Sequence, residues 1–258
     1  MFYNNFKMNV ESKTVKREIF AAPESLKPRR THYCPGCGHG IAHRLVAQAI
    51  DRLGVREKTI GVVPVGCACI AYEYFNFDCS EAPHGRAPAV ATGLKRAMPD
   101  NIVFTYQGDG DLASIGGNEI LHTANRGENI TVIFINNAVY GMTGGQMAPT
   151  TLMGQKTATT PDGRMKLSGY PLKITEILSG FEGVVFAARA MLTSPKEILK
   201  AKHLVFKAFQ NQVIGKGFSI VELLSPCPTY WRKSPADAKK WIEEIMSNYF
   251  ECKVLKDV

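Results

Sequence analysis

The chain of 258 residues carries 31 lysines and arginines against 23 aspartates and glutamates, which gives a formal net charge of +8 at pH 7. Hydrophobic residues make up 45% of the chain and charged residues 21%, proportions that are ordinary for a globular protein and exclude an intrinsically disordered one. The positive residues are spread along the sequence without the aromatic-interleaved basic runs typical of nucleic-acid readout, so we expect no nucleic-acid partner.

Two further features bear on the compartment. Residues 1–18 lack the apolar core and small-residue cleavage site of a secretory signal peptide, and no apolar run approaches the roughly 20 residues of a membrane span. We therefore expect a cytoplasmic protein with no membrane partner. Because an odd set of seven cysteines is a poor basis for disulfides in a reducing compartment, metal ligation or buried thiols are the better interpretations.

Residues 1–30 combine mixed charge with little periodicity, and we expect an N-terminal extended arm that packs on a partner or is loosely ordered. The body, residues 31–258, alternates β-branched runs with helical periodicity. Helices are predicted at 40–53, 88–96, 113–125, 172–178, 195–213 and 236–249. Strands are predicted at 59–65, 102–106, 130–135, 184–187 and 218–224.

This alternation predicts an α/β fold that is doubly wound, with a mainly parallel sheet covered by helices on both faces. In such sheets ligands bind at the carboxyl ends of the strands. The segment 136–170 is rich in Gly, Thr, Met and Pro. A loop of this length inside a compact domain is usually functional.

A Gly-Asp-Gly-Asp run at 108–111 follows the predicted strand 102–106 and precedes a helix. Glycines let the backbone approach an anion, a helix N-terminus offers free N–H groups to phosphate, and Asp109 can hold a cation that bridges phosphate oxygens. Asn137 follows the next strand 28 residues later (137 − 109 = 28), so one helix and one strand return the chain to the same edge. Gly-Asp-Gly alone is an ordinary turn, but with Asn-Asn at this interval it is the signature of thiamine diphosphate binding.

The cysteines form a second group. Cys34 and Cys37 are a Cys-x-x-Cys pair on a Gly/Pro turn before a helix, a spacing with which two thiolates can bind one metal or cluster. Cys67 and Cys227 each follow a predicted strand, so four thiolates can converge at the edge of the sheet that binds ligands. Four thiolates suit zinc as well as an iron–sulfur cluster, and both interpretations stay open on these residues alone.

Together the two groups resemble the beta subunits of 2-oxoacid:ferredoxin oxidoreductases. The resemblance runs from about Thr31 to Trp231, and the segment from Tyr140 to Thr151 is similar to the loop that covers the cofactor in this family. It implies a thiamine diphosphate-binding fold whose cofactors are thiamine diphosphate, Mg²⁺ and one 4Fe–4S cluster.

The resemblance also implies roles for individual residues. Mg²⁺ would be held by Asp109, Asn137 and the Val139 carbonyl. The cofactor-binding residues would be Gly108, Asp109, Gly110, Asp111, Asn137, Val139, Gly141 and Thr143. The cluster ligands would be Cys34, Cys37, Cys67 and Cys227, with Cys69 competing for the place of Cys67.

Three residues are implied at the reacting end of the site. Met142 would lie near the thiazolium, although a methionine is as often a core residue. His84 and Arg86 belong to a His-Gly-Arg segment that lies near cofactor and substrate in the family. The ordinary alternative for this segment is a turn that caps a helix, with Arg86 as an anchor of the loop.

The implied activity is oxidative decarboxylation of a 2-oxoacid to an acyl-CoA, with electrons passed to ferredoxin. One thiamine diphosphate-binding domain fills the chain, so an alpha-type pyrimidine-binding subunit and a ferredoxin-like subunit are expected, and the isolated chain is expected to be inactive. Apolar Ile70 favours a branched-chain substrate such as 2-oxoisovalerate, with 2-oxoglutarate as the alternative. A non-redox thiamine diphosphate decarboxylase subunit and a zinc-stabilised scaffold are the other functions considered.

Overall fold

A seven-stranded sheet forms the centre of the structure, a computed structural model that describes residues 21–258. The strand order is β2-β1-β3-β4-β8-β7-β9, and every neighbouring pair is parallel except β7 with β9. Its strands are β1 (Thr59–Val63), β2 (Asp78–Glu81), β3 (Ile102–Gly108), β4 (Thr131–Asn136), β7 (Val184–Met191), β8 (Phe218–Leu224) and β9 (Val254–Asp257). A separate antiparallel hairpin pairs β5 (Val139–Tyr140) with β6 (Gln146–Met147).

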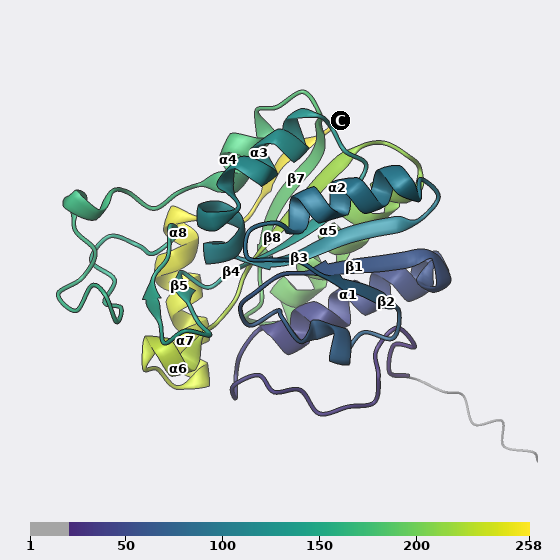
Figure 1. The fold of residues 1–258 in the computed structure, drawn as a ribbon. Coiled ribbons are helices and arrows are strands. Elements are labelled where there is room, and N and C mark those ends of the chain that lie inside the picture. The colour runs from purple at the N-terminus through teal and green to yellow at the C-terminus, as the bar shows by residue number, and fades with distance from the viewer. Residues whose placement is uncertain (1–20) are drawn as a thin grey trace, which may run out of the picture.

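Helices cover both faces of this sheet. The α-helices are α1 (His39–Leu53), α2 (Ala87–Ala97), α3 (Gly117–Asn125), α4 (Ile174–Ser179), α5 (Pro195–Val213), α6 (Pro228–Trp231), α7 (Pro235–Trp241) and α8 (Ser247–Tyr249). One face carries α1 and α5, and the other carries α2, α3 and α4 (Figure 1). The predicted doubly wound α/β fold is therefore confirmed. Within residues 21–258, the helices are too short or too polar to cross a membrane.

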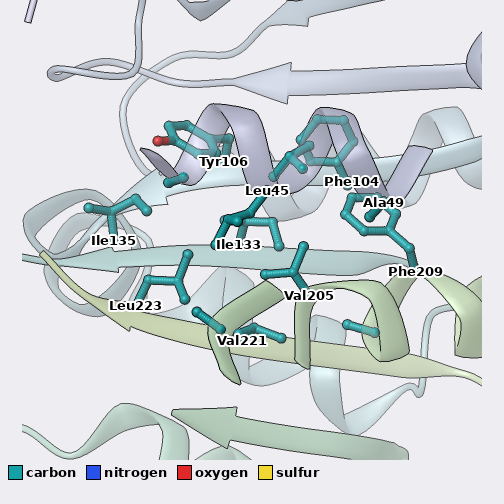
Figure 2. Packing of buried hydrophobic residues seen from close by; sticks show 14 of the residues in the cluster. Leu45, Ala49, Phe104, Tyr106, Ile133, Ile135, Val205, Phe209, Val221 and Leu223 are labelled. Carbon is teal, nitrogen blue, oxygen red and sulfur yellow. The ribbon is translucent and has the colours of Figure 1, made fainter. Parts of the chain in front are cut away.

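Alternation along the central strands explains the two layers of core. On β4, Ile133 and Ile135 pack into the cluster under α1 and α5, whereas Val132 and Phe134 pack into the opposite cluster. Figure 2 shows Ile133 in the first cluster, which also contains Phe104 of β3 and residues of both covering helices. Because successive side chains of a strand point to opposite faces, a strand buried on both faces must be apolar throughout.

Several predicted elements differ from the observed ones. Helix 195–213 and strand 218–224 coincide with α5 and β8. The single helix predicted at 113–125 is interrupted, because a π-helical turn (Asp111–Ile115) precedes α3. The helix predicted at 236–249 is likewise α7, a π-helical turn (Ile242–Met246) and α8. The predicted strand 184–187 extends to Met191 as β7.

Strands β2 and β9 and the β5–β6 hairpin were not predicted. The two edge strands are short and largely exposed, so they lack the apolar run that identifies the central strands. The hairpin lies inside the predicted loop 136–170, which also contains a 3₁₀ turn (Lys166–Ser168). Two further 3₁₀ turns, Arg56–Lys58 and Ala71–Glu73, flank β1.

Residues 1–20 of the predicted N-terminal arm lie outside the described residues. Within residues 21–30, Ser25 and Leu26 contact the body of the chain, and packing of the arm on a partner stays a prediction. Leu26 forms an isolated bridge with Phe75, and the Ser25 hydroxyl donates to Asp51 Oδ1 at 2.5 Å. Ser25 is fully buried, so at least this part of the arm belongs to the packed domain.

The hairpin folds over the carboxyl end of β3. The Tyr140 ring lies against Gly110, and its hydroxyl donates to the Gly110 carbonyl at 3.2 Å. A Cβ built on Gly110 would overlap the Tyr140 ring, so glycine is required by packing here and not by a positive φ.

Replacing Gly110 by alanine is expected to destabilise the chain by about 1–3 kcal/mol, because the added methyl group overpacks this contact. The matched control is Gly117→Ala on α3, where a Cβ would meet open space and helix propensity favours alanine. Urea unfolding of both variants measures the difference. Equal stability of Gly110→Ala and wild type would show that Tyr140 does not pack as described.

Candidate functional site

A pocket opens at the carboxyl edge of the sheet, where the loops after β1, β3 and β4 meet. All eight residues predicted to bind the cofactor line it: Gly108, Asp109, Gly110, Asp111, Asn137, Val139, Gly141 and Thr143. His84 and Met142 also line it. We call this the diphosphate pocket.

Asp109 stands at the centre of the pocket and is nearly inaccessible to solvent. Its Oδ1 accepts from the Gly110 amide at 2.9 Å, and its Oδ2 accepts from the Thr150 hydroxyl at 2.5 Å. Burial raises the pKa of Asp109 to about 7, although these hydrogen bonds act to lower it. A carboxylate in this setting is best held in its charged form by a cation.

Asn137 and Val139 lie on a tight turn at the end of β4. Ala138 between them has a φ of 57°, and the Asn136 side chain accepts from its amide at 3.1 Å. The Asn136 amide group in turn donates to Glu222 at 2.7 Å. The turn is therefore fixed from below by a buried polar contact, and it presents an amide side chain and a backbone carbonyl to the pocket.

The donor set fits Mg²⁺. A carboxylate from Asp109, the side chain of Asn137 and the carbonyl of Val139 come from one pocket and offer the oxygen ligands that a hard cation prefers. The Trp231 indole also donates to the Asn137 carbonyl at 3.0 Å, so α6 braces the same turn from the other side.

The carboxylate of Asp111 is occupied within the chain. Its Oδ1 accepts from His84 Nδ1 at 2.5 Å and from the Gly85 amide at 2.7 Å, while Oδ2 accepts from the Gln107 amide group at 2.6 Å. Burial raises the pKa of Asp111, against these donors. The Asp111 side chain thus positions His84 at the pocket wall, and the expected contact of Asp111 with the diphosphate stays a prediction.

Arg86 and Met142 are placed differently from one another. Arg86 does not line the pocket, because its guanidinium forms an ion pair with Glu119 on α3. This ion pair fits the alternative role of Arg86 as an anchor of the loop, and its contact with cofactor or substrate stays a prediction. Met142 is 53% exposed at the rim of the pocket, which excludes the alternative of a core methionine.

Four cysteines line a second pocket next to the first: Cys34, Cys37, Cys67 and Cys227. We call it the thiolate pocket. Cys69 lines neither pocket, which favours Cys67 as the third sulfur donor. The Gly38 amide donates to the Pro226 carbonyl at 3.4 Å, and this contact joins the Cys-x-x-Cys turn to the loop after β8.

Zinc and an iron–sulfur cluster place different demands on the four sulfurs. Tetrahedral zinc needs four sulfurs about 3.8 Å apart, from Zn–S bonds of about 2.3 Å. Within residues 21–258, no three His, Cys, Asp or Glu side chains are arranged to hold one metal ion. An iron–sulfur cluster binds each thiolate at a different iron, so its four sulfurs stand farther apart than those of a zinc site.

The four thiols differ in exposure, from exposed Cys34 to buried Cys227. Burial first, and neighbouring cysteines second, raise the pKa of Cys67 to about 11. Burial, partly offset by the Tyr230 amide, raises that of Cys227 to about 12. Such groups are protonated at neutral pH unless a metal displaces the proton, so any group bound here would have to supply that driving force.

Gly141 separates the two pockets. A Cβ on this residue would lie 3.2 Å from Cys67 Sγ, 3.7 Å from Asn137 Nδ2 and 3.9 Å from Cys227 Sγ. Because Gly141 has no side chain, the thiols of Cys67 and Cys227 and the side chain of Asn137 lie close around it.

Sequence reasoning missed two residues at the site. His39 lines both pockets, its Nδ1 is 2.8 Å from the Tyr106 hydroxyl, and burial lowers its pKa to about 3, so it is neutral. Its position two residues after Cys37 was the available signal. Thr150 bonds Asp109 across 41 residues of sequence, and no local pattern marks that contact.

Comparisons with known proteins place the chain in a family. The model of the thiamine pyrophosphate enzyme C-terminal TPP binding domain matches residues 64–222. Ketoisovalerate oxidoreductase subunit VorA of Methanothermobacter marburgensis is 50% identical over 241 residues, which cover 93% of this chain and 50% of that protein. The chain thus spans about half the length of this relative.

Two other proteins are matched over more of their own length. The 2-oxoglutarate synthase subunit KorB of Archaeoglobus fulgidus is 40% identical over 214 residues, which cover 83% of this chain and 76% of KorB. The structure of 2-oxoglutarate:ferredoxin oxidoreductase from Magnetococcus marinus matches with a TM-score of 0.72 and 29% identity, covering 84% of this chain and 71% of that one. The chain therefore belongs to the 2-oxoacid:ferredoxin oxidoreductase family, and its fold is the thiamine diphosphate-binding domain of that family.

Proposed function

We propose that the chain is the subunit that holds thiamine diphosphate, Mg²⁺ and one 4Fe–4S cluster in an enzyme that oxidatively decarboxylates a 2-oxoacid to an acyl-CoA and reduces ferredoxin. The observation that carries this proposal is the common wall of the two pockets, since His39, Cys67, Asn137 and Gly141 line both. The first pocket offers oxygen ligands for a metal ion, and the second offers thiolates. Two such sites in contact suit a reaction that couples decarboxylation to electron transfer.

Thiamine diphosphate, when bound, supplies the electron sink that decarboxylation of a 2-oxoacid requires. Asp109, Asn137 and the Val139 carbonyl would hold the Mg²⁺ that neutralises the diphosphate. Cys34, Cys37, Cys67 and Cys227 would hold the cluster as thiolates. The chain's own contribution is position, because the buried contacts at Asp109 and Asn136 fix the oxygen donors before any ligand arrives.

His84 lines the diphosphate pocket, and Asp111 orients its ring from behind. Asp111 accepts from its Nδ1, so the other ring nitrogen is available to contact the diphosphate or the substrate carboxylate. Met142 at the rim would shield the thiazolium end of the site from water.

The lining of the diphosphate pocket favours an aliphatic substrate. Among the described residues that line it, none is lysine or arginine, so this part of the chain contributes no fixed cation to pair with the second carboxylate of 2-oxoglutarate. Val65, Ala68 and Met142 supply apolar surface at the same place. Together with the higher identity to the ketoisovalerate enzyme, this supports 2-oxoisovalerate as substrate.

Partners are needed to complete the enzyme. The aminopyrimidine ring of thiamine diphosphate requires a glutamate, and no glutamate is among the described residues that line the pocket. An alpha-type subunit would supply it and close the pocket over the thiazolium end. Ferredoxin, or a ferredoxin-like subunit, and coenzyme A complete the set of partners in this proposal.

The complex of this chain with its partner subunits is expected to use 2-oxoisovalerate with a kcat/KM about tenfold or more above that for 2-oxoglutarate, since an unpaired carboxylate in the pocket is costly. Reduction of ferredoxin in the presence of coenzyme A is the assay, and turnover should require thiamine diphosphate and Mg²⁺. A preference for 2-oxoglutarate would contradict the substrate assignment, and turnover without thiamine diphosphate would contradict the whole proposal.

The cysteine pair Cys67 and Cys69 offers a matched test of the thiolate pocket. Cys67→Ser should lower the iron content and visible absorption of the anaerobically purified chain by about half or more, because it removes one of four cluster ligands. Cys69→Ser, two residues away and outside the pocket, should leave both at the wild-type level. The reverse result would make Cys69 the ligand. Unchanged iron content and absorption in both variants would show that the thiolate pocket holds no cluster.

A further inference from the structure

A groove on the surface lies next to the thiolate pocket and shares lining residues with it. Thr229 and Tyr230 line the pocket on one side and the groove on the other. The groove is otherwise lined by residues 144–145, 156–158, Pro161, Trp231 at the end of α6 and Arg232 directly after it. Figure 1 places α6 beside the β5–β6 hairpin, and a Cβ on Gly145 would lie 2.9 Å from the Tyr230 side chain.

A second groove adjoins the first and shares Lys156 and Trp231 with it. Three exposed cations line the two grooves: Lys156, Arg232 and Lys233. Within residues 21–258, none of the three lies within ion-pair distance of a carboxylate. Two acidic residues of α7 and the turn after it have partners of their own, since Asp237 accepts from Ser234 and Glu244 pairs with Lys240 at 3.7 Å. The cations are therefore free to attract an anionic partner.

Apolar side chains lie between the cations. Trp231 and Trp241 have ring centroids 4.5 Å apart and line the adjoining groove with Ile245, which is 50% exposed. An aromatic centre with unpaired charges around it matches a protein-binding surface of the transient, electrostatically steered kind. A binding site for a small anion would not require an aromatic surface of this kind, so the surface favours a protein partner.

We propose that this surface, formed by Lys156, Trp231, Arg232 and Lys233, docks an acidic one-electron carrier protein beside the thiolate pocket. This inference rests on the proposed function, in which the four thiolates hold the electron-transfer group. Each docking event reduces the carrier by one electron and oxidises that group by one electron, and no atom is transferred. Thr229 and Tyr230 keep the carrier one layer of side chains from the thiols.

The test uses the complete enzyme complex and a purified acidic 2[4Fe–4S] ferredoxin. The double variant Lys156→Glu/Lys233→Glu is expected to weaken ferredoxin binding, measured by calorimetry at low salt, by about tenfold or more. The difference should shrink as salt is added, because exposed charges are screened. The matched control is Lys216→Glu, an exposed lysine before β8 at the opposite edge of the sheet, which should leave the dissociation constant unchanged.

Turnover with the small dye benzyl viologen separates this inference from the proposed function. Unchanged dye reduction by the double variant, with weakened ferredoxin binding, supports the docking surface. Ferredoxin binding equal to wild type, or weakened to the same degree by Lys216→Glu, overturns it. A raised KM for coenzyme A with normal ferredoxin binding also overturns it and assigns the cations to an anionic cosubstrate. Absence of 2-oxoacid-dependent dye reduction in the wild-type complex would instead count against the proposed function.

Discussion

The parallel pairing of β1, β3, β4 and β8 is the constraint on which the rest of the structure depends. Parallel strands end at the same edge of a sheet, so residues far apart in sequence meet there. Gly108 pairs with Ile135, and Asn136 pairs with Leu224, which sets the ends of three neighbouring strands at nearly the same height. The residues that follow these ends supply the oxygen donors and one of the four thiols.

Holding polar groups at this edge requires compensation, because a buried charge or amide without a partner is costly. Below the Asn136 turn, Glu222 is almost fully buried and forms an ion pair with Arg189 at 2.8 Å, and the Thr175 hydroxyl donates to the Glu222 carboxylate at 2.5 Å. The cation and the carboxylate therefore neutralise each other within the sheet. This arrangement leaves the Asn137 side chain and the Val139 carbonyl, and not the residues beneath them, to face the pocket.

Much of this could be predicted from sequence, and the remainder has a physical reason. The central strands are buried on both faces and so are apolar runs, and the Gly-Asp-Gly, Asn-Asn and Cys-x-x-Cys motifs are local. The hydrogen bond from Thr150 to Asp109, the ion pair of Arg86 with Glu119 and the place of His39 in the shared wall are tertiary contacts. Such contacts join residues far apart in the chain, so no local sequence pattern predicts them. The edge strands β2 and β9 could not be predicted because they are largely exposed and lack an apolar pattern.

The central claim is that an oxygen-donor site and a cluster of thiolates share one wall at this edge. Anaerobic purification of the chain, followed by iron, acid-labile sulfide and zinc analysis with the visible spectrum, tests it most directly. We expect about four irons and four sulfides per chain with broad brown absorption, as one 4Fe–4S cluster requires. A colourless protein with about one zinc per chain would contradict the claim, because tetrahedral zinc would remove the electron acceptor from beside the diphosphate pocket.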